Sequence, residues 1–245
     1  MRSNCFFAWA LVLALFAGPV RADQPVSAYL SLKGVNIHYI VQGSGSPVVL
    51  VHGWQSSAQL NWQAPGILAA LARKHRVIAL DLPGYGRSDR PAAADAYGAQ
   101  WIEDVLGLLD HLAVRQAHIV GYSMGGMVAL KFTADHPDRV MSVALGGMGL
   151  LRRGGGMQQA WTFMPDTASR GVAELALTPE QVKSVRAPVE IVVGSNDPVR
   201  RLYIGPLLEV RRDWPVVEIA DADHLTCLFK AQFIDELARW LAIGR

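Results

Sequence analysis

Cysteine is scarce in this chain, and neither sign of charge dominates. The 245 residues include two cysteines, Cys5 and Cys227, and 23 basic side chains stand against 21 acidic ones. Two cysteines are too few for a small scaffold held together by disulfides. No His, Cys, Asp or Glu cluster has the spacing of metal ligands, and no basic patch indicates a nucleic-acid partner. A chain of this length can bury a full core without such aids.

Residues 1–22 have the pattern of a secretory signal peptide. Arg2 precedes the uncharged run Cys5–Ala17, and Val20-Arg21-Ala22 places small residues where a signal peptidase reads. The run is shorter than the ~20 residues of a spanning helix, and Gly18-Pro19 interrupts it. We predict cleavage after Ala22 and an exported protein, periplasmic or extracellular, with no stable membrane span. An uncleaved anchor is the alternative.

Removal of the signal peptide changes the charge and the cysteine content of the chain. The segment contains Arg2, Arg21 and Cys5 and no acidic residue, so the remainder carries 21 basic and 21 acidic side chains. The mature chain is then formally neutral, which again argues against nucleic acid as a partner. Its single cysteine, Cys227, cannot form an intramolecular disulfide, and we expect it to be a buried structural thiol.

Residues 23–245 alternate short apolar runs with helical patterns, and we expect one domain. Continuous apolar strands between helices predict an α/β fold with a doubly wound, mostly parallel sheet covered on both faces. In such sheets the functional site lies at the carboxyl ends of the strands. The expected strands are 35–41, 48–51, 76–80, 118–120, 140–145, 189–193 and 216–219, and the clearest helices are 60–74, 100–113, 124–134 and 231–241.

Residues 146–187 depart from this alternation. They are rich in Gly, Met and Arg and show weak periodicity, apart from an expected helix over 178–185 that starts with Thr178 as N-cap and Pro179 in the first position. We interpret the segment as a short lid or cap. A surface loop is the alternative.

The pentapeptide Gly121-Tyr122-Ser123-Met124-Gly125 has the G-x-S-x-G pattern between an expected strand and an expected helix. A nucleophilic serine must stand on a sharp strand-to-helix turn, and glycines on either side keep that turn free of side chains. The helix that follows favours negative charge at its N-terminus. Ser123 is therefore the candidate nucleophile.

A serine hydroxyl needs a base, usually a histidine held by a carboxylate, in the chain order serine, acid, histidine. His224 follows the last expected strand, whereas His136 lies at a helix end where a solvated or capping role fits better. Asp197 follows a strand directly and is the candidate acid. The remaining acidic residues considered are too close to His224 or lie in the irregular segment: Asp166, Glu174, Asp221 and Asp223.

His52-Gly53-Trp54 follows the strand expected over 48–51. Glycine allows close backbone approach there, and the amides of Trp54 and Met124 would form an oxyanion hole. We expect His52, Gly53 and Tyr122 to contact the substrate. The Gly- and Pro-rich stretch 81–89 lacks the lysine of a phosphate-binding loop, and we interpret it as a structural turn near Ser123.

Taken together, these motifs resemble the α/β-hydrolase fold family across nearly the whole mature chain. The matching pieces are Val48–Gly53 with Trp54, Asp81–Asp89, Gly121–Gly126, Gly194–Asp197 with Pro198, and Asp223-His224. The resemblance implies an eight-stranded sheet, a Ser123–Asp197–His224 triad and no cofactor. The Ser-Met-Gly-Gly sequence is similar to that of esterases, lipase-like enzymes and C–C-bond hydrolases. Haloalkane dehalogenases have an aspartate in place of Ser123.

We therefore expect a secreted serine hydrolase, a carboxylesterase that cleaves a small or medium apolar ester through an acyl-enzyme. The first alternative keeps the triad but cleaves a C–C bond or transfers an acyl group. The second is a non-catalytic binding protein, because fold alone does not determine function. The expected partner is a small-molecule substrate, and no metal is expected. The substrate and the oligomeric state cannot be read from the sequence.

Overall fold

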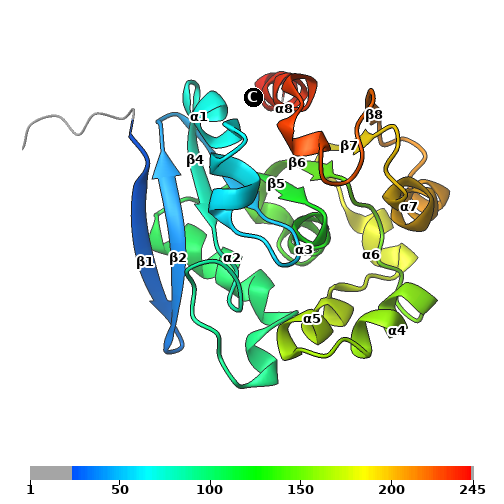
Figure 1. The fold of residues 1–245 in the computed structure, drawn as a ribbon, viewed down its shortest axis with the longest axis horizontal. Coiled ribbons are helices and arrows are strands. Elements are labelled where there is room, and N and C mark those ends of the chain that lie inside the picture. Colours follow the sequence, from blue (N-terminus) through cyan, green and yellow to red (C-terminus); the bar gives the residue numbers. More distant parts are fainter. Residues whose placement is uncertain (1–23, 244–245) are drawn as a thin grey trace, which may run out of the picture.

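The computed structural model describes residues 24–243, so the predicted signal segment lies outside the described residues. Its centre is an eight-stranded sheet in the order β1-β2-β4-β3-β5-β6-β7-β8 (Figure 1). The pairs β1–β2 and β2–β4 are antiparallel, and the remaining pairs are parallel. This confirms the mostly parallel sheet. The strands are β1 Val26–Leu32, β2 Val35–Gln42, β3 Ser46–Val51, β4 His75–Leu80, β5 Ala117–Tyr122, β6 Val140–Gly146, β7 Val189–Gly194 and β8 Val216–Ile219.

Helices cover both faces of the sheet, as the buried strands require. On β3, Val49 and Val51 join the core under α2 and α3, whereas Val48 and Leu50 join the core under α1 and α8 (Figure 1). No helix within residues 24–243 is long and apolar enough to cross a membrane. The helices are α1 Ile67–Ala72, α2 Gln100–His111, α3 Met124–Asp135, α4 Gly156–Thr162, α5 Thr167–Gly171, α6 Pro179–Ser184, α7 Gly205–Val210 and α8 Ala231–Ile243.

Two elements differ from the sequence-based expectation. The single helix expected over 60–74 is wrong: a π-helical turn, Gln59–Gln63, is separated from α1 by Gly66, whose φ of 84° is left-handed. The first strand, β1, was not expected. It is an edge strand with mostly exposed side chains, so it carries little of the apolar signal that marks buried strands.

The segment 146–187 folds into short helices in the structure. Thr178 caps α6 as expected: its hydroxyl accepts from the Gln181 amide, and the Gln181 side chain accepts from the Thr178 amide, so both halves of a capping box are present. Two side chains of this segment meet Trp54, since the indole nitrogen of Trp54 donates to Ser169 Oγ at 2.6 Å and its ring packs edge-on against Trp161. The segment thus packs beside the loop that follows β3.

The turn from β5 into α3 is the most constrained part of the backbone. Ser123 has a φ of 54° and a ψ of −123°, a conformation that costs a residue with a side chain about 1–3 kcal/mol. Neighbouring backbone leaves no room for side chains at either side: a Cβ on Gly121 would lie 2.0 Å from the Gly125 carbonyl oxygen, and one on Gly125 would lie 2.1 Å from that of Val51. The glycines of the pentapeptide are therefore required by packing.

We predict that Gly121→Ala destabilises the protein by at least about 3 kcal/mol, because the added methyl group meets backbone that cannot move aside. Gly156→Ala is the matched control, since a Cβ there meets nothing within 4 Å and its φ is not left-handed. We expect the control to change the unfolding free energy by less than about 1 kcal/mol. Urea unfolding monitored by tryptophan fluorescence measures both. Equal stability of the two variants would contradict this account of the turn.

Candidate active site

Three side chains from the carboxyl ends of β5, β7 and β8 form one hydrogen-bond relay. Ser123 Oγ lies 2.9 Å from His224 Nε2, and His224 Nδ1 lies 2.7 Å from Asp197 Oδ2. The structure thus brings together the three residues that the sequence singled out. If Nδ1–H donates to the carboxylate, Nε2 is left as the acceptor for the serine proton. The arrangement can therefore move a proton from Ser123 to His224.

The base and the acid are each held by contacts of their own. The Asp197 side chain is fully buried, and its second oxygen accepts from the Val199 amide at 2.9 Å. Tyr122 OH donates to the His224 carbonyl at 2.6 Å, and the Tyr122 ring lies beside the imidazole with 5.5 Å between centroids. Asp223 shapes the His224 loop by accepting from the amides of Leu225 and Thr226. Both the ring and the backbone of His224 are therefore held in place.

The loop after β3 lies directly against the serine. A Cβ on Gly53 would be 3.2 Å from Ser123 Cβ, and the Gly53 amide donates to Asn61 Oδ1 at 2.8 Å. This contact fixes the turn that presents Trp54. Met124 is the first residue of α3, a position whose amide has no acceptor within its own helix. Trp54 thus follows a glycine that lies against Ser123, and Met124 follows Ser123 directly, so both candidate oxyanion-hole residues lie next to the serine.

His52, for which we expected substrate contact, is not among the residues that line the cavity beside Ser123. His52 is fully buried, with Nδ1 2.7 Å from the Gly53 carbonyl oxygen and Nε2 3.0 Å from the Leu82 amide nitrogen. Burial lowers the pKa of His52, which keeps the imidazole neutral, so Nδ1–H donates and Nε2 accepts. Its role is to tie the Gly53 turn to the loop after β4. Periodicity could not reveal this, because a histidine after a strand also fits an open site.

A cavity of about 420 Å³ opens beside Ser123. Gly53 and Tyr122, for which we expected substrate contact, lie in its wall, and none of the described residues that line it is a lysine, arginine, aspartate or glutamate. Asn61 also lines this cavity, although it was not among the site residues expected from the sequence. The lining residues are Gly53, Trp54, Gln55, Ser56, Leu60, Asn61, Tyr122, Ser123, His224, Leu225, Leu228 and Phe229. Such a wall suits an uncharged, largely apolar group.

Two other side chains of reactive types are not members of this relay. Cys227 is buried as expected, and burial raises the pKa of its thiol to about 11, which keeps it protonated and unreactive. His136 lies at the end of α3 and contacts Glu103 at 3.3 Å. Within residues 24–243, no group of three His, Cys, Asp or Glu side chains is arranged to hold a metal ion.

Comparison with known proteins places these features in a family. Residues 46–175 match the alpha/beta hydrolase fold family. A 2-hydroxymuconate semialdehyde hydrolase from Pseudomonas putida is 36% identical over 130 residues, which cover 52% of this chain and 46% of that protein. The dihydrolipoyllysine-residue acetyltransferase component of an acetoin cleaving system from Cupriavidus necator is 31% identical over 185 residues, 75% of this chain and 45% of that protein.

The matched regions thus span less than half the length of these curated relatives. Among solved structures, a bacterial membrane phospholipase A superposes with a TM-score of 0.73 at 23% identity, over 91% of this chain and 87% of that one. At that identity the likeness supports the fold alone. The family match covers more than half of this chain and includes the Ser123 turn and the loop after β3. The chain belongs to the α/β-hydrolase fold family.

Proposed function

We propose that this protein is a serine hydrolase in which Ser123 attacks a carbonyl carbon. The observation that carries the proposal is the relay from Ser123 through His224 to Asp197, with both distances below 3.0 Å. A hydrogen-bonded base next to the hydroxyl, itself oriented by a buried carboxylate, is what converts a weak nucleophile into a reactive one. A non-catalytic binding protein would have no need of this alignment.

The steps follow from the geometry. Ser123 Oγ bonds to the carbonyl carbon while its proton passes to His224 Nε2, and the amides of Trp54 and Met124 stabilise the oxyanion. The oxyanion collapses, the bond to the leaving group breaks, and the leaving group takes the proton from Nε2. Water then gives a proton to Nε2 and attacks the acyl-enzyme. The second oxyanion collapses, the bond to Ser123 Oγ breaks, Oγ takes the proton back from Nε2, and the acid is released. Asp197 stabilises the imidazolium in both halves of the reaction.

The identity of the nucleophile restricts the substrate to acyl compounds. Attack of a serine on an alkyl halide would leave an alkyl ether, which water does not cleave under these conditions. Attack on a carbonyl leaves an ester, which the same base can hydrolyse. Ser123 therefore disfavours dehalogenation, for which a carboxylate nucleophile gives a hydrolysable alkyl ester.

For the bond that is cleaved, the sequence comparisons favour a carbon–carbon bond over the carboxylic ester that we expected from the sequence alone. Relatives at 36–37% identity carry the name 2-hydroxymuconate semialdehyde hydrolase. A carbon leaving group departs when its electron pair is delocalised onto a conjugated carbonyl, and the residues of the relay supply every other step. We therefore propose hydrolysis of a C–C bond beside a ketone or aldehyde carbonyl as the leading activity.

Ester hydrolysis is the second candidate, and the cavity wall favours it. The relatives' named substrate bears a carboxylate, whereas no lysine or arginine is among the described residues that line the Ser123 cavity. An uncharged ester with an apolar acyl group fits this wall better. We further propose that residues 146–187 act as a cap over the bound acyl group, which is supported by the contacts of Trp161 and Ser169 with Trp54.

The two activities separate in one assay. We expect wild type to be labelled at Ser123 by an alkyl fluorophosphonate and to turn over either 4-nitrophenyl butyrate or 2-hydroxymuconate semialdehyde. Ser123→Ala should lower kcat on the better substrate by about 10⁶-fold while leaving the fold intact. Turnover of the semialdehyde above that of the ester supports C–C cleavage, and the reverse supports an esterase. Unlabelled wild type without turnover of either compound contradicts the hydrolase proposal.

Asp197→Asn tests the orienting acid separately. An amide at this position can donate to Nδ1, which shifts the imidazole proton to Nε2 and removes the acceptor for Ser123. We expect kcat to fall by about 10⁴-fold, with KM little changed. Asp221→Asn is the matched control, since this exposed aspartate lies near the loop but outside the relay, and it should retain activity. A similar loss in both variants would contradict the assignment of Asp197.

We also propose that residues 1–22 direct export and are removed. The support is the sequence pattern alone: Arg2, the uncharged run Cys5–Ala17 and the small residues before Asp23. Expression of the full chain in a Gram-negative host should give periplasmic protein whose N-terminal residue is Asp23. An N-terminal sequence that still begins at residue 1 in the membrane fraction would instead identify an anchor.

A further inference from the structure

A second cavity, of about 490 Å³, lies between the β1–β2 hairpin and the segment 57–63. It is separate from the Ser123 cavity, and only Leu60 borders both. Its wall is more polar than the wall beside Ser123. The polar side chains that line it include Ser27, His38, Ser57, Gln59, Gln63 and Arg87.

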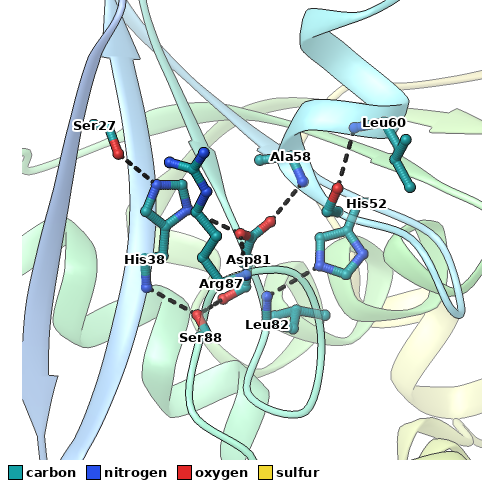
Figure 2. Close-up of polar contacts among 10 residues, drawn as sticks. Ser27, His38, His52, Ala58, Leu60, Asp81, Leu82, Arg87 and Ser88 are labelled. Atoms are coloured by element: carbon teal, nitrogen blue, oxygen red, sulfur yellow. Dashed lines mark hydrogen bonds and ion pairs between the residues drawn. The ribbon is translucent and has the colours of Figure 1, made fainter.

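In this cavity the structure repeats the order of groups found at Ser123. Ser27 Oγ lies 2.7 Å from His38 Nε2, and His38 Nδ1 lies 2.8 Å from Asp81 Oδ2 (Figure 2). The corresponding distances at Ser123 are 2.9 and 2.7 Å. Ser27 lies on edge strand β1 and His38 on its neighbour β2, where a diagonal cross-strand pair brings their side chains together.

The acid of this second relay is firmly placed. Asp81 is buried, its Oδ1 accepts from the Ala58 amide at 2.6 Å, and its Oδ2 accepts from the Arg87 amide at 2.9 Å (Figure 2). A carboxylate engaged only as an acceptor takes a further bond from His38 Nδ1–H. That tautomer leaves His38 Nε2 as an acceptor for the Ser27 hydroxyl proton.

The nucleophile and a cation both face solvent. Ser27 is exposed although its histidine is buried, so a reagent can reach Oγ while the base stays shielded. The exposed Arg87 side chain lines the same cavity as Ser27 and His38. A guanidinium there attracts an anionic group and can stabilise an oxyanion on a bound acyl carbon.

We propose that Ser27, His38 and Asp81 form a second nucleophilic centre, which is acylated by small esters that carry a carboxylate. Ser27 Oγ bonds to the acyl carbon and its proton passes to His38 Nε2. The ester C–O bond breaks, and the leaving alkoxide takes that proton. Water then gives a proton to Nε2, attacks the acyl-Ser27 ester and releases the acid, and Ser27 Oγ regains the proton.

The direct test removes the nucleophile Ser123 and then locates any adduct at Ser27. Ser123→Ala protein is treated with a small alkyl fluorophosphonate, and the N-terminal peptide of the mature chain, residues 23–33, which contains both Ser27 and Ser31, is fragmented in a mass spectrometer. Ser31 is the internal control, because it lies exposed on the same strand without a histidine partner among the hydrogen bonds of the described residues. We expect the adduct on Ser27 to form about 100-fold faster than any on Ser31, since a positioned base contributes that much.

Three outcomes decide this test. An adduct that forms on Ser27 faster than on Ser31 supports the proposal, and this result does not depend on Ser123 being reactive. An unmodified Ser27, or one labelled no faster than Ser31, overturns it. In the wild-type protein, labelling of Ser27 without labelling of Ser123 would retain this centre while contradicting the function proposed above.

Arg87 allows the substrate class to be tested in the same background. In Ser123→Ala protein, mono-4-nitrophenyl glutarate should release nitrophenol about tenfold faster than 4-nitrophenyl valerate, which is close in length but uncharged. Arg87→Gln removes the guanidinium while keeping the amide that binds Asp81, and it should abolish the preference. Arg90→Gln, an exposed neighbour outside the cavity, should keep it. A preference that survives Arg87→Gln overturns the assignment of the anion site.

Discussion

The close backbone contact at the turn after β5 is the constraint on which the rest of the site depends. Ser123 can hold a left-handed φ only because its amide donates to the Gly146 carbonyl on β6 at 2.8 Å and because Gly121 and Gly125 let α3 start against the end of β3. The same contact brings Gly53 against Ser123. The same backbone contacts therefore fix the nucleophile, the N-terminus of α3 and the Trp54 loop. A side chain at any of these glycines would displace all three.

The sequence was sufficient to predict the residues of the Ser123 relay, because each of them follows a strand. Ser123, Asp197 and His224 each follow a parallel strand, and the carboxyl ends of such strands meet at one edge, so chain order and topology were enough to bring them together. The sequence was not sufficient for side chains whose hydrogen-bond partner is a backbone group or lies in a distant loop. Both His52 nitrogens bond to backbone atoms, one of Gly53 and one of Leu82, and the Asn61 side chain accepts from the Gly53 amide. Contacts of this kind produce no periodic pattern in the sequence.

Asp81 illustrates the same limit more sharply. The Gly- and Pro-rich stretch 81–89 reads locally as a turn, and it is one, but its first carboxylate also accepts from Ala58 and contacts His38 on another strand. These partners are 23 and 43 residues away along the chain. Because the Ala58 bond anchors the start of the segment 57–63, Asp81 supports the wall that separates the two cavities. A residue that organises a turn thus also orients a histidine.

The two relays share hydrogen-bond geometry but differ in what surrounds the serine. Ser123 stands at the N-terminus of a twelve-residue helix beside the Trp54 loop, where backbone dipoles are fixed before a substrate arrives. Ser27 lies on an edge strand, and the charge that can assist it is carried by the flexible, solvent-facing side chain of Arg87. Preorganised dipoles in a partly enclosed site stabilise an oxyanion more than a solvated guanidinium does, because water screens the latter. The alignment of serine, histidine and aspartate therefore determines which hydroxyl groups can act as nucleophiles. The environment of the oxyanion determines the rate of the reaction. On that ground we expect Ser123 to be the faster of the two proposed centres and Ser27 the slower one.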